Sequence, residues 1–127
     1  MTEKETQQLE RLRSPFDETL IEKRTDSNGF NYFPVKVIRE RFNQVIGEDK
    51  YIFIDHKPTL LTVQDKLYFE VFAPLVVTLC EGSIIKDVGY SLHQVRYAKD
   101  STSVLDFDAD AAAAITVAQR NAMKSLI

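Results

Sequence analysis

The hydrophobic pattern in the middle of the chain is typical of β-strands, because short apolar or alternating runs are separated by turn residues. The predicted strands occupy residues 51–55, 59–64, 67–79 and 84–92. The third is about twice as long as a usual strand of roughly 5–6 residues. Pro74 lies inside it and favours a bulge or an edge position, since proline cannot donate a ladder hydrogen bond.

Short polar segments separate these strands. Asp65-Lys66 turns into the long strand, and residues 80–83, with Gly82, form the turn that follows it. The long strand and its successor therefore form an extended antiparallel hairpin.

Helical periodicity flanks the strands on both sides. Between Pro34 and Ile46 the apolar residues fall on one stripe, and Gly47 is a natural stop. An Ala-rich helix is expected from about Asp108 to Ile127. Its apolar face consists of Ala111, Ala114, Ile115, Ala118, Ala122 and Leu126.

The first third of the chain has weaker signals. Residues 1–10 read as a flexible or weakly helical tail. A short helix is expected over residues 14–24, where Ser14 can cap it and Pro15 suits the first helical position. Residues 25–32 read as a turn around Asn28-Gly29.

The element order α-α-β-β-β-α predicts the α+β class: an antiparallel three- to four-stranded β-meander (a β-β-β-α core) flanked by helices. One domain is expected over residues 11–127. The chain stops inside its last helix without a glycine or polar cap. We therefore expect either the boundary of a longer protein or a disordered tail beyond residue 127.

Hydropathy and cysteine content indicate the cellular compartment of the protein. The longest apolar stretch is interrupted by Glu70, Pro74 and Glu81, so it is too short for a membrane span, and the charged N-terminus is unlike a signal peptide. A single cysteine, Cys80, excludes an internal disulfide and suits a reducing compartment. We expect a cytoplasmic protein.

The residues favour binding over catalysis. His56 and His93 lack partners at metal-ligand spacing, and Cys80 has no basic activator nearby, so we interpret it as a buried or idle thiol. The chain contains no phosphate-binding glycine loop, nucleophile elbow or paired-carboxylate motif. The alternating Asp106, Asp108 and Asp110 are better explained as helix N-capping than as a calcium loop. We expect no enzyme activity, metal or cofactor.

The placement of the basic residues suggests that the protein binds phosphate groups. The net charge is −3, but outside the acidic N-terminal tail the charges are nearly balanced, so their placement matters more than their sum. Basic side chains gather on the helices and adjoining loops, where together they could neutralise phosphates without reading bases. The candidates are Lys36, Arg39, Arg41, Lys66, Arg96, Lys99, Arg120 and Lys124, with Asn121 beside the last pair. Tyr97, in the basic loop, is the one aromatic residue that we expect to stack on a base.

Four segments, in order, resemble one known family. Residues 66–91, KLYFEVFAPLVVTLCEGSIIKDVGYS, resemble the central hairpin of the Rad-fifty-two single-strand annealing family and its phage and bacterial relatives. That family has a long strand, a turn with glycine, then an acidic residue followed by Asp-Val-Gly-Tyr-Gly; Lys86 and Ser91 depart from the first and last positions. The other matches are LRSPFDETLIEKR, YFPVKVIRERFNQVIGEDKY and the closing AAITVAQRNAMKSLI.

The resemblance implies a non-enzymatic protein that binds single-stranded DNA and anneals complementary strands without ATP, in recombination and DNA repair, in the cytoplasm of a bacterial or phage-infected host cell. It implies a homo-oligomer, either a ring or a helical filament, with a single-strand-binding protein or a nuclease as further partners. Arg120 and Lys124 match basic residues of the last helix that contact the DNA backbone, and Asn121 replaces the second member of a basic pair.

Other site residues follow from the same resemblance. Val37 stands where the family has an arginine, with Lys36 adjacent. Lys66 matches a basic residue associated with a second DNA-binding surface, and either Arg96 or Lys99 takes the basic position before the last helix.

Two other classes of protein remain open. A double-stranded-RNA-binding domain shares the α-β-β-β-α order, but it is shorter and needs lysines where this chain has acidic residues at the start of the last helix. An oligomeric protein-interaction scaffold without DNA binding fits the net acidity better. The salt dependence of binding to single strands separates these classes from an annealing protein.

Overall fold

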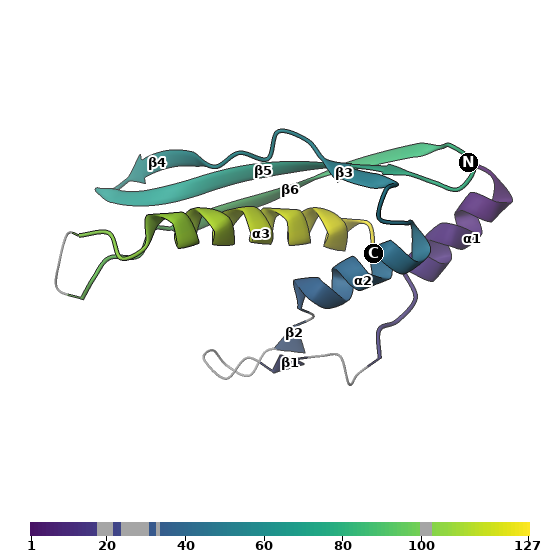
Figure 1. Cartoon of the computed structure of the whole chain (residues 1–127), viewed down its shortest axis with the longest axis horizontal. Helices are drawn as coiled ribbons and strands as arrows, with labels where there is room; N and C mark the ends of the chain where they lie inside the picture. Colours follow the sequence, from purple (N-terminus) through teal and green to yellow (C-terminus); the bar gives the residue numbers. More distant parts are fainter. Residues whose placement is uncertain (18–21, 24–30, 33, 100–102) are drawn as a thin grey trace.

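The computed structural model describes residues 1–17, 22–23, 31–32, 34–99 and 103–127. This part of the chain forms three helices, a four-stranded antiparallel sheet and a separate pair of two-residue strands (Figure 1). The helices are α1 (Glu3–Leu12), α2 (Val35–Val45) and α3 (Phe107–Ser125). The strands are β1 (Glu22–Lys23), β2 (Asn31–Tyr32), β3 (Tyr51–Phe53), β4 (Thr59–Val63), β5 (Lys66–Thr78) and β6 (Ile84–Gln94).

Strand β5 is the central strand of the sheet and pairs with all three of the others. On one side β6 pairs with it continuously, from Tyr68↔Gln94 to Thr78↔Ile84. On the other side β4 pairs with the first part of β5, and β3 pairs with its last part. The predicted α+β class and antiparallel sheet are confirmed. Strands β4, β5 and β6 pair in sequence order, as a three-stranded meander does. Strand β3 departs from this order, because β3 and β4 follow one another along the same edge of β5, which explains why β5 is so long.

Pro74 occupies neither a bulge nor an edge strand, so that expectation is wrong. It lies inside β5, opposite Val88, and its carbonyl accepts a hydrogen bond from Ile54 N, 2.9 Å away. The N–H and carbonyl of one residue point to the same side of an antiparallel strand. The donor that proline lacks would therefore point to the side where β3 ends, so no ladder bond to β6 is lost.

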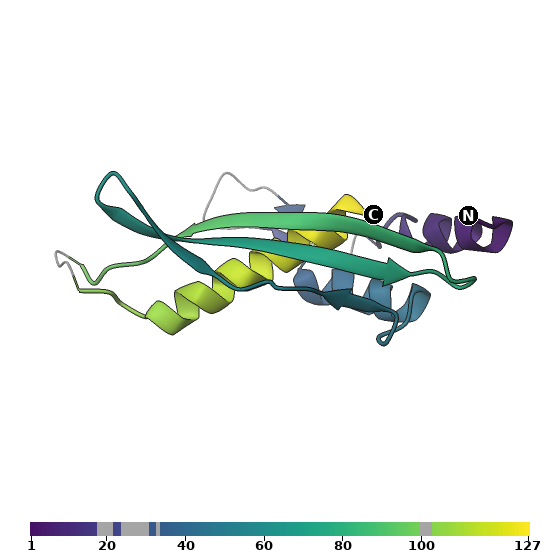
Figure 2. The same cartoon turned by 90° about the horizontal axis from the view of Figure 1, so that it is seen from above.

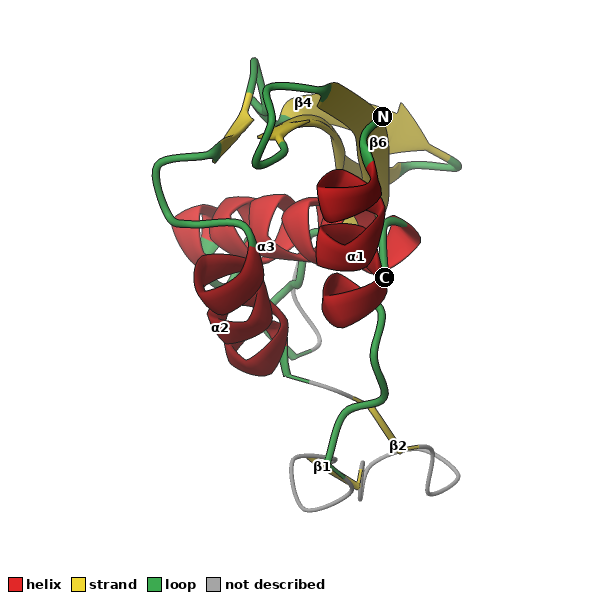
Figure 3. Cartoon of the chain, turned by 90° about the vertical axis from the view of Figure 1, so that its right-hand side faces the viewer, coloured by secondary structure: helices red, strands yellow, loops and turns green. Residues whose placement is uncertain are grey.

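All three helices lie on one face of the sheet (Figures 1 and 3). Every second side chain of β5 is buried on this face: Phe69, Val71, Ala73, Leu75 and Val77. The intervening side chains point to the opposite face, over which no described helix or strand lies (Figure 2). The sheet is therefore covered by helices on one side only.

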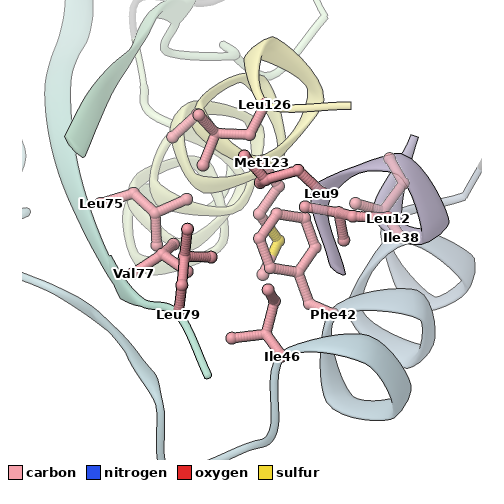
Figure 4. Packing of buried hydrophobic residues seen from close by; sticks show 11 residues of the cluster. Leu9, Leu12, Ile38, Phe42, Ile46, Leu75, Val77, Leu79, Met123 and Leu126 are labelled. Carbon is pink, nitrogen blue, oxygen red and sulfur yellow. The ribbon is translucent and has the colours of Figure 1, made fainter. Parts of the chain in front are cut away.

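The hydrophobic core has two clusters beneath the sheet. The larger one joins the end of β5 to all three helices, with Phe42 of α2 and Met123 of α3 fully buried near its centre (Figure 4). The smaller cluster lies between the start of β5 and α3, around Phe69, Ala114 and Ala118. Both clusters depend on α3, which runs along the length of the sheet.

The N-terminal segment is a helix that packs into the core, where the sequence suggested a flexible or weakly helical tail. Thr2 and Glu5 form a capping box at the start of α1, and Leu9 and Leu12 are buried in the larger cluster. The charges of this segment do not keep it in solvent, because one of them, Glu5, is itself buried.

The short helix expected over residues 14–24 is not found where the chain is described. Residues 14–17 are not helical, and Glu22–Lys23 is strand β1, which pairs with Asn31–Tyr32 of β2. Residues 18–21, with most of the predicted turn at 25–32, lie outside the described residues.

The remaining secondary-structure predictions agree closely with the structure. Helices α2 and α3 and strands β3 to β6 begin and end within a few residues of their expected positions. Gly47 has a positive φ of 108° directly after α2, as a helix stop requires. The turn before β5 is centred one residue earlier than expected, since Gln64 and Asp65 both have positive φ.

Candidate nucleic-acid interface

Helix α3 carries the main predicted contacts, and its position is set by unusually close packing on β6. A Cβ atom added to Gly89 would lie 1.8 Å from the carbonyl oxygen of Ala118. The three alanines that face the sheet, Ala114, Ala118 and Ala122, are fully buried. Small residues on both elements let the two backbones approach, which fixes the direction of the side chains on the rest of α3.

Arg120 and Lys124 lie four residues apart on α3 and therefore share one flank. Their neighbours show which flank this is: Gln119 bonds to Arg39 of α2, and Asn121 bonds to Tyr90 of β6. At about 100° per residue, Arg120 points to a flank between these two contacts, away from both partners.

This flank has uncompensated positive charge. Arg120 is half-buried, and its Nε is buried without a hydrogen-bond partner in the described part of the chain, whereas Lys124 is exposed. Among the described residues no carboxylate lies within 4.0 Å of either side chain. From Ala111 to the last residue the sequence contains these two cations and no acidic residue. The flank is suited to an anion, although two cations near a helix C-terminus are also stabilised by the helix dipole.

Two other predicted DNA contacts, Asn121 and Arg39, already form hydrogen bonds within the chain. Asn121 donates through Nδ2 to the carbonyl oxygen of Tyr90 at 2.8 Å, so its amide ties α3 to the free edge of β6. Arg39 donates to the side-chain oxygen of Gln119 and ties α2 to α3. Lys36 is exposed on the first turn of α2 and has no described partner. Of these three, only Lys36 has its charged group fully available.

Arg41, which the sequence grouped with the surface cations, has a structural role. Its guanidinium donates to the carbonyl oxygens of Leu12 and Ser14, at 3.1 and 2.8 Å, and stacks 4.0 Å from the centre of the Phe16 ring. It therefore satisfies orphan carbonyls at the C-terminus of α1 and holds this helix against α2.

A second basic group lies at the opposite end of α3. Lys66 begins β5 and is exposed, and the β5–β6 register, continued by Val95 N bonding to Leu67 O at 2.9 Å, brings Arg96 to the same end of the sheet. Lys99 is exposed just beyond, and Tyr97 forms an isolated bridge with Val104. From Asp110 to Lys124, α3 rises by about 21 Å at 1.5 Å per residue. The predicted residues therefore form two separate groups.

Asp110 organises this second group, and sequence reasoning gave it the wrong role. Asp106 caps α3 as predicted, accepting from Ala109 N at 3.0 Å. Asp110 is instead buried. Its Oδ2 accepts from Arg96 N at 2.9 Å, and its Oδ1 accepts from Arg96 Nε at 2.8 Å and lies 3.1 Å from His93 Nε2. Nothing in the spacing of the aspartates distinguishes this carboxylate from its neighbours.

The charge on Asp110 is held in place by its donors. Burial alone raises the pKa of this carboxyl, but the bonds from Arg96 and His93 outweigh it, so the pKa lies below its ordinary value. The guanidinium of Arg96, whose side chain is 55% exposed, is thus partly neutralised by Asp110. Lys66 and Lys99 remain the better cations for phosphate at this end.

A second buried carboxylate joins α1 to the β5–β6 turn. Glu5 accepts from Ser83 Oγ at 2.7 Å, from Ser83 N at 2.9 Å and from Glu81 N at 3.2 Å. The hydrogen bond from the Ser83 side chain, with backbone bonds from Thr2, Ser83 and Glu81, lowers the pKa of Glu5 to about 2. The turn and α1 therefore form one unit, which the sequence did not indicate.

Other candidate chemistry is sparse in the described residues. No group of three or more His, Cys, Asp or Glu side chains there could hold a metal ion. Cys80 is exposed, so of the two expectations, a buried or an idle thiol, the buried one is wrong. A depression of about 340 Å³ lies between the β3–β4 loop and Ile115, and the Nδ1 atom of His56, one of its lining residues, is buried without a described partner.

Comparison with known proteins adds no family assignment. No protein-family model matches the sequence, and no curated protein matches it. Within the described residues, no helix has the length and apolar character needed to cross a membrane.

Proposed function

We propose that this protein binds single-stranded DNA through its backbone phosphates and anneals complementary strands without ATP. The observation that carries the proposal is the flank of α3 with the half-buried Arg120 and the exposed Lys124, two cations that no described carboxylate neutralises. Annealing requires reversible binding that leaves the base edges free, and contacts to phosphates satisfy this requirement.

The resemblance of the hairpin and the last helix to the Rad-fifty-two family supports the same reaction. In that family a basic flank of the last helix follows the backbone of the bound strand, and subunits associate into rings or filaments. Here Lys66 and Lys99, at the other end of α3, are suited to a second contact with the same or another strand.

The test is binding of a fluorescent oligo-dT strand, measured by anisotropy at several salt concentrations. If Arg120 and Lys124 each neutralise one phosphate, the double variant Arg120→Ala/Lys124→Ala reduces the slope of log K against log salt by about 1.4, at about 0.7 per contact for single strands. We expect it to abolish binding at moderate salt while keeping the particle mass of the wild type.

A matched control removes the same charge elsewhere. Lys4→Ala/Arg11→Ala changes two exposed cations of α1 and is expected to leave oligo-dT binding within about twofold of the wild type, apart from the weak effect of net charge. Annealing of complementary oligonucleotides without ATP completes the test. Full affinity in the Arg120/Lys124 variant would show that the site is elsewhere, and absence of binding at low salt by the wild type would exclude the function.

The alternative is an oligomeric scaffold that does not bind DNA. It is favoured by one observation, the apolar face of the sheet that no described helix covers. A scaffold would associate with itself normally and show no salt-dependent binding to oligo-dT.

A further inference from the structure

The face of the sheet opposite the helices has the composition of a protein interface. Six large apolar side chains on this face are between 42% and 61% exposed. They are Ile52, Phe72, Ile84, Val88, Tyr90 and Leu92. Phe72 and Tyr90 are cross-strand partners with ring centroids 5.0 Å apart, so the middle of the face is aromatic. We call this surface the outer face.

The outer face is large enough for stable association. Eleven paired rows of β5 and β6, at about 3.4 Å each, and three strands about 4.8 Å apart give a footprint of about 500 Å². The footprint includes polar positions such as Glu70 and Lys86, and its size is comparable with the roughly 300–600 Å² of the largest apolar patch on a typical monomer. Two such footprints together bury about 1,000 Å², which is near the lower bound for a specific protein interface.

The free edge of β6 is less suited to association than this face. Val88 N donates to the Oδ1 atom of its own neighbour Asp87 at 2.8 Å. The carbonyl oxygen of Tyr90 accepts from Asn121 at 2.8 Å. A strand added along this edge needs both groups for its ladder, so the two side chains oppose sheet extension at the middle of β6.

Two charges on the outer face are arranged so that the face complements a second copy of itself. Glu70 lies three rows from the pair Ala73↔Gly89 in one direction, and Lys86 lies three rows from it in the other. A two-fold axis at this level, parallel to the sheet and perpendicular to the strands, brings the Glu70 row of one copy over the Lys86 row of the other. It also brings Phe72 and Tyr90 over the row of Pro74 and Val88.

We propose that the outer face is an isologous interface, on which a second copy of this chain packs sheet against sheet. The two sheets lie about 10 Å apart, as in sandwiches. Glu70 of each copy forms an ion pair with Lys86 of the other at either end of an apolar centre. A nucleic acid is a poorer occupant, because the Glu70 carboxylate lies beside the aromatic pair, where it accepts a hydrogen bond from Tyr90 at 2.9 Å and repels phosphates.

The test is the particle mass in the absence of DNA, by light scattering over a range of protein concentrations. Val88→Glu buries a carboxylate at the proposed centre and is expected to halve the mass, whatever other contacts build a larger assembly. Lys86→Glu places two carboxylates face to face and is expected to weaken the association by roughly tenfold or more. Combining Lys86→Glu with Glu70→Lys restores the opposite charges and is expected to restore the association.

Controls separate this outcome from misfolding and from DNA binding. Ala112→Glu adds the same charge at an exposed position of α3 and is expected to keep the wild-type mass. Circular dichroism checks that Val88→Glu, at a residue more than half exposed, stays folded. A monomeric wild type, an unchanged mass in Val88→Glu or no rescue by the double exchange would overturn the proposal. So would variants that keep their mass but lose oligo-dT affinity, since the face would then bind DNA. Loss of DNA binding in the Arg120/Lys124 variant leaves this assay unaffected.

Discussion

Gly89 is the point at which the packing of α3 on the sheet is most sensitive to one atom. The change Gly89→Ala adds a Cβ that would lie 1.8 Å from Ala118 O, 2.5 Å from Ala122 N and 2.9 Å from Ala118 C. All three are backbone atoms of α3, so no side chain can rotate away, and the helix must move by more than 1 Å.

The cost follows from this displacement. Overpacking of this kind costs about 1–3 kcal/mol. The same shift loosens two bonds between β6 and α3, from Ser91 Oγ to Ala114 O at 2.6 Å and from Asn121 to Tyr90 O. Each is worth about 0.5–1.5 kcal/mol. Alanine gains back about 0.5–1 kcal/mol in a strand through backbone entropy. We expect a net loss of about 3 kcal/mol.

Thermal and urea unfolding, followed by circular dichroism at neutral pH, measure this loss, which corresponds to a fall in Tm of about 10 °C for a domain of this size. Gly82→Ala is the matched control, because Gly82 has a positive φ of 93° but nothing within 4 Å of an added Cβ. It carries only the backbone strain of about 1–2 kcal/mol. If Gly89→Ala melts within about 3 °C of the wild type, or above Gly82→Ala, the close approach of α3 is not as described.

Two further predictions concern the buried carboxylates. Folding lowers the pKa of Glu5 from 4.5 to about 2, so its contribution to stability is complete above about pH 4.5 and is lost as the pH falls towards 2. Glu5→Gln should therefore be less stable than the wild type at neutral pH, with the two melting curves converging near pH 2; a constant difference across this range would contradict the assignment. Asp110→Asn keeps the shape of the side chain but loses charge-assisted bonds to Arg96 and His93, and we expect it to destabilise the protein by about 1–3 kcal/mol in urea unfolding. Amide hydrogen exchange should also accelerate at Arg96 N; unchanged exchange there would refute the role of Asp110 as the anchor of this segment.

The Asp-Val-Gly-Tyr run shows how a sequence motif can have several structural roles at once. Asp87 caps the free N–H of Val88, Gly89 admits α3, and Tyr90 bonds to Glu70 through its hydroxyl and to Asn121 through its carbonyl. The bond to Glu70 raises the pKa of the Tyr90 hydroxyl above its ordinary value. These contacts join β5, β6 and α3, so the motif acts as scaffold for the basic flank.

The periodicity of apolar residues predicted most of the helices and strands, because it reflects which side of each element is buried. Helix α2, helix α3 and the β5–β6 hairpin each show a regular alternation of buried and exposed residues, and Gly47 and Gly82 mark positions with positive φ. The same logic failed for α1, since a helix that buries Glu5 and Gln8 together with two leucines lacks a clear apolar stripe. It also failed for Pro74, whose tolerance depends on where β3 ends along the neighbouring edge.

For the candidate site, too, some features follow from the sequence and others only from the tertiary structure. The sequence by itself determined which cations stand on one helical flank, as for Arg120 and Lys124, because a spacing of four residues fixes their common direction. Only the tertiary structure decided which cations are already engaged by the fold, as Arg41 and Arg96 are, and that one face of the sheet is left uncovered. The physical reason is that hydrogen bonds such as those of Glu5 and Asp110 join residues far apart in the chain, and no local pattern specifies their partners.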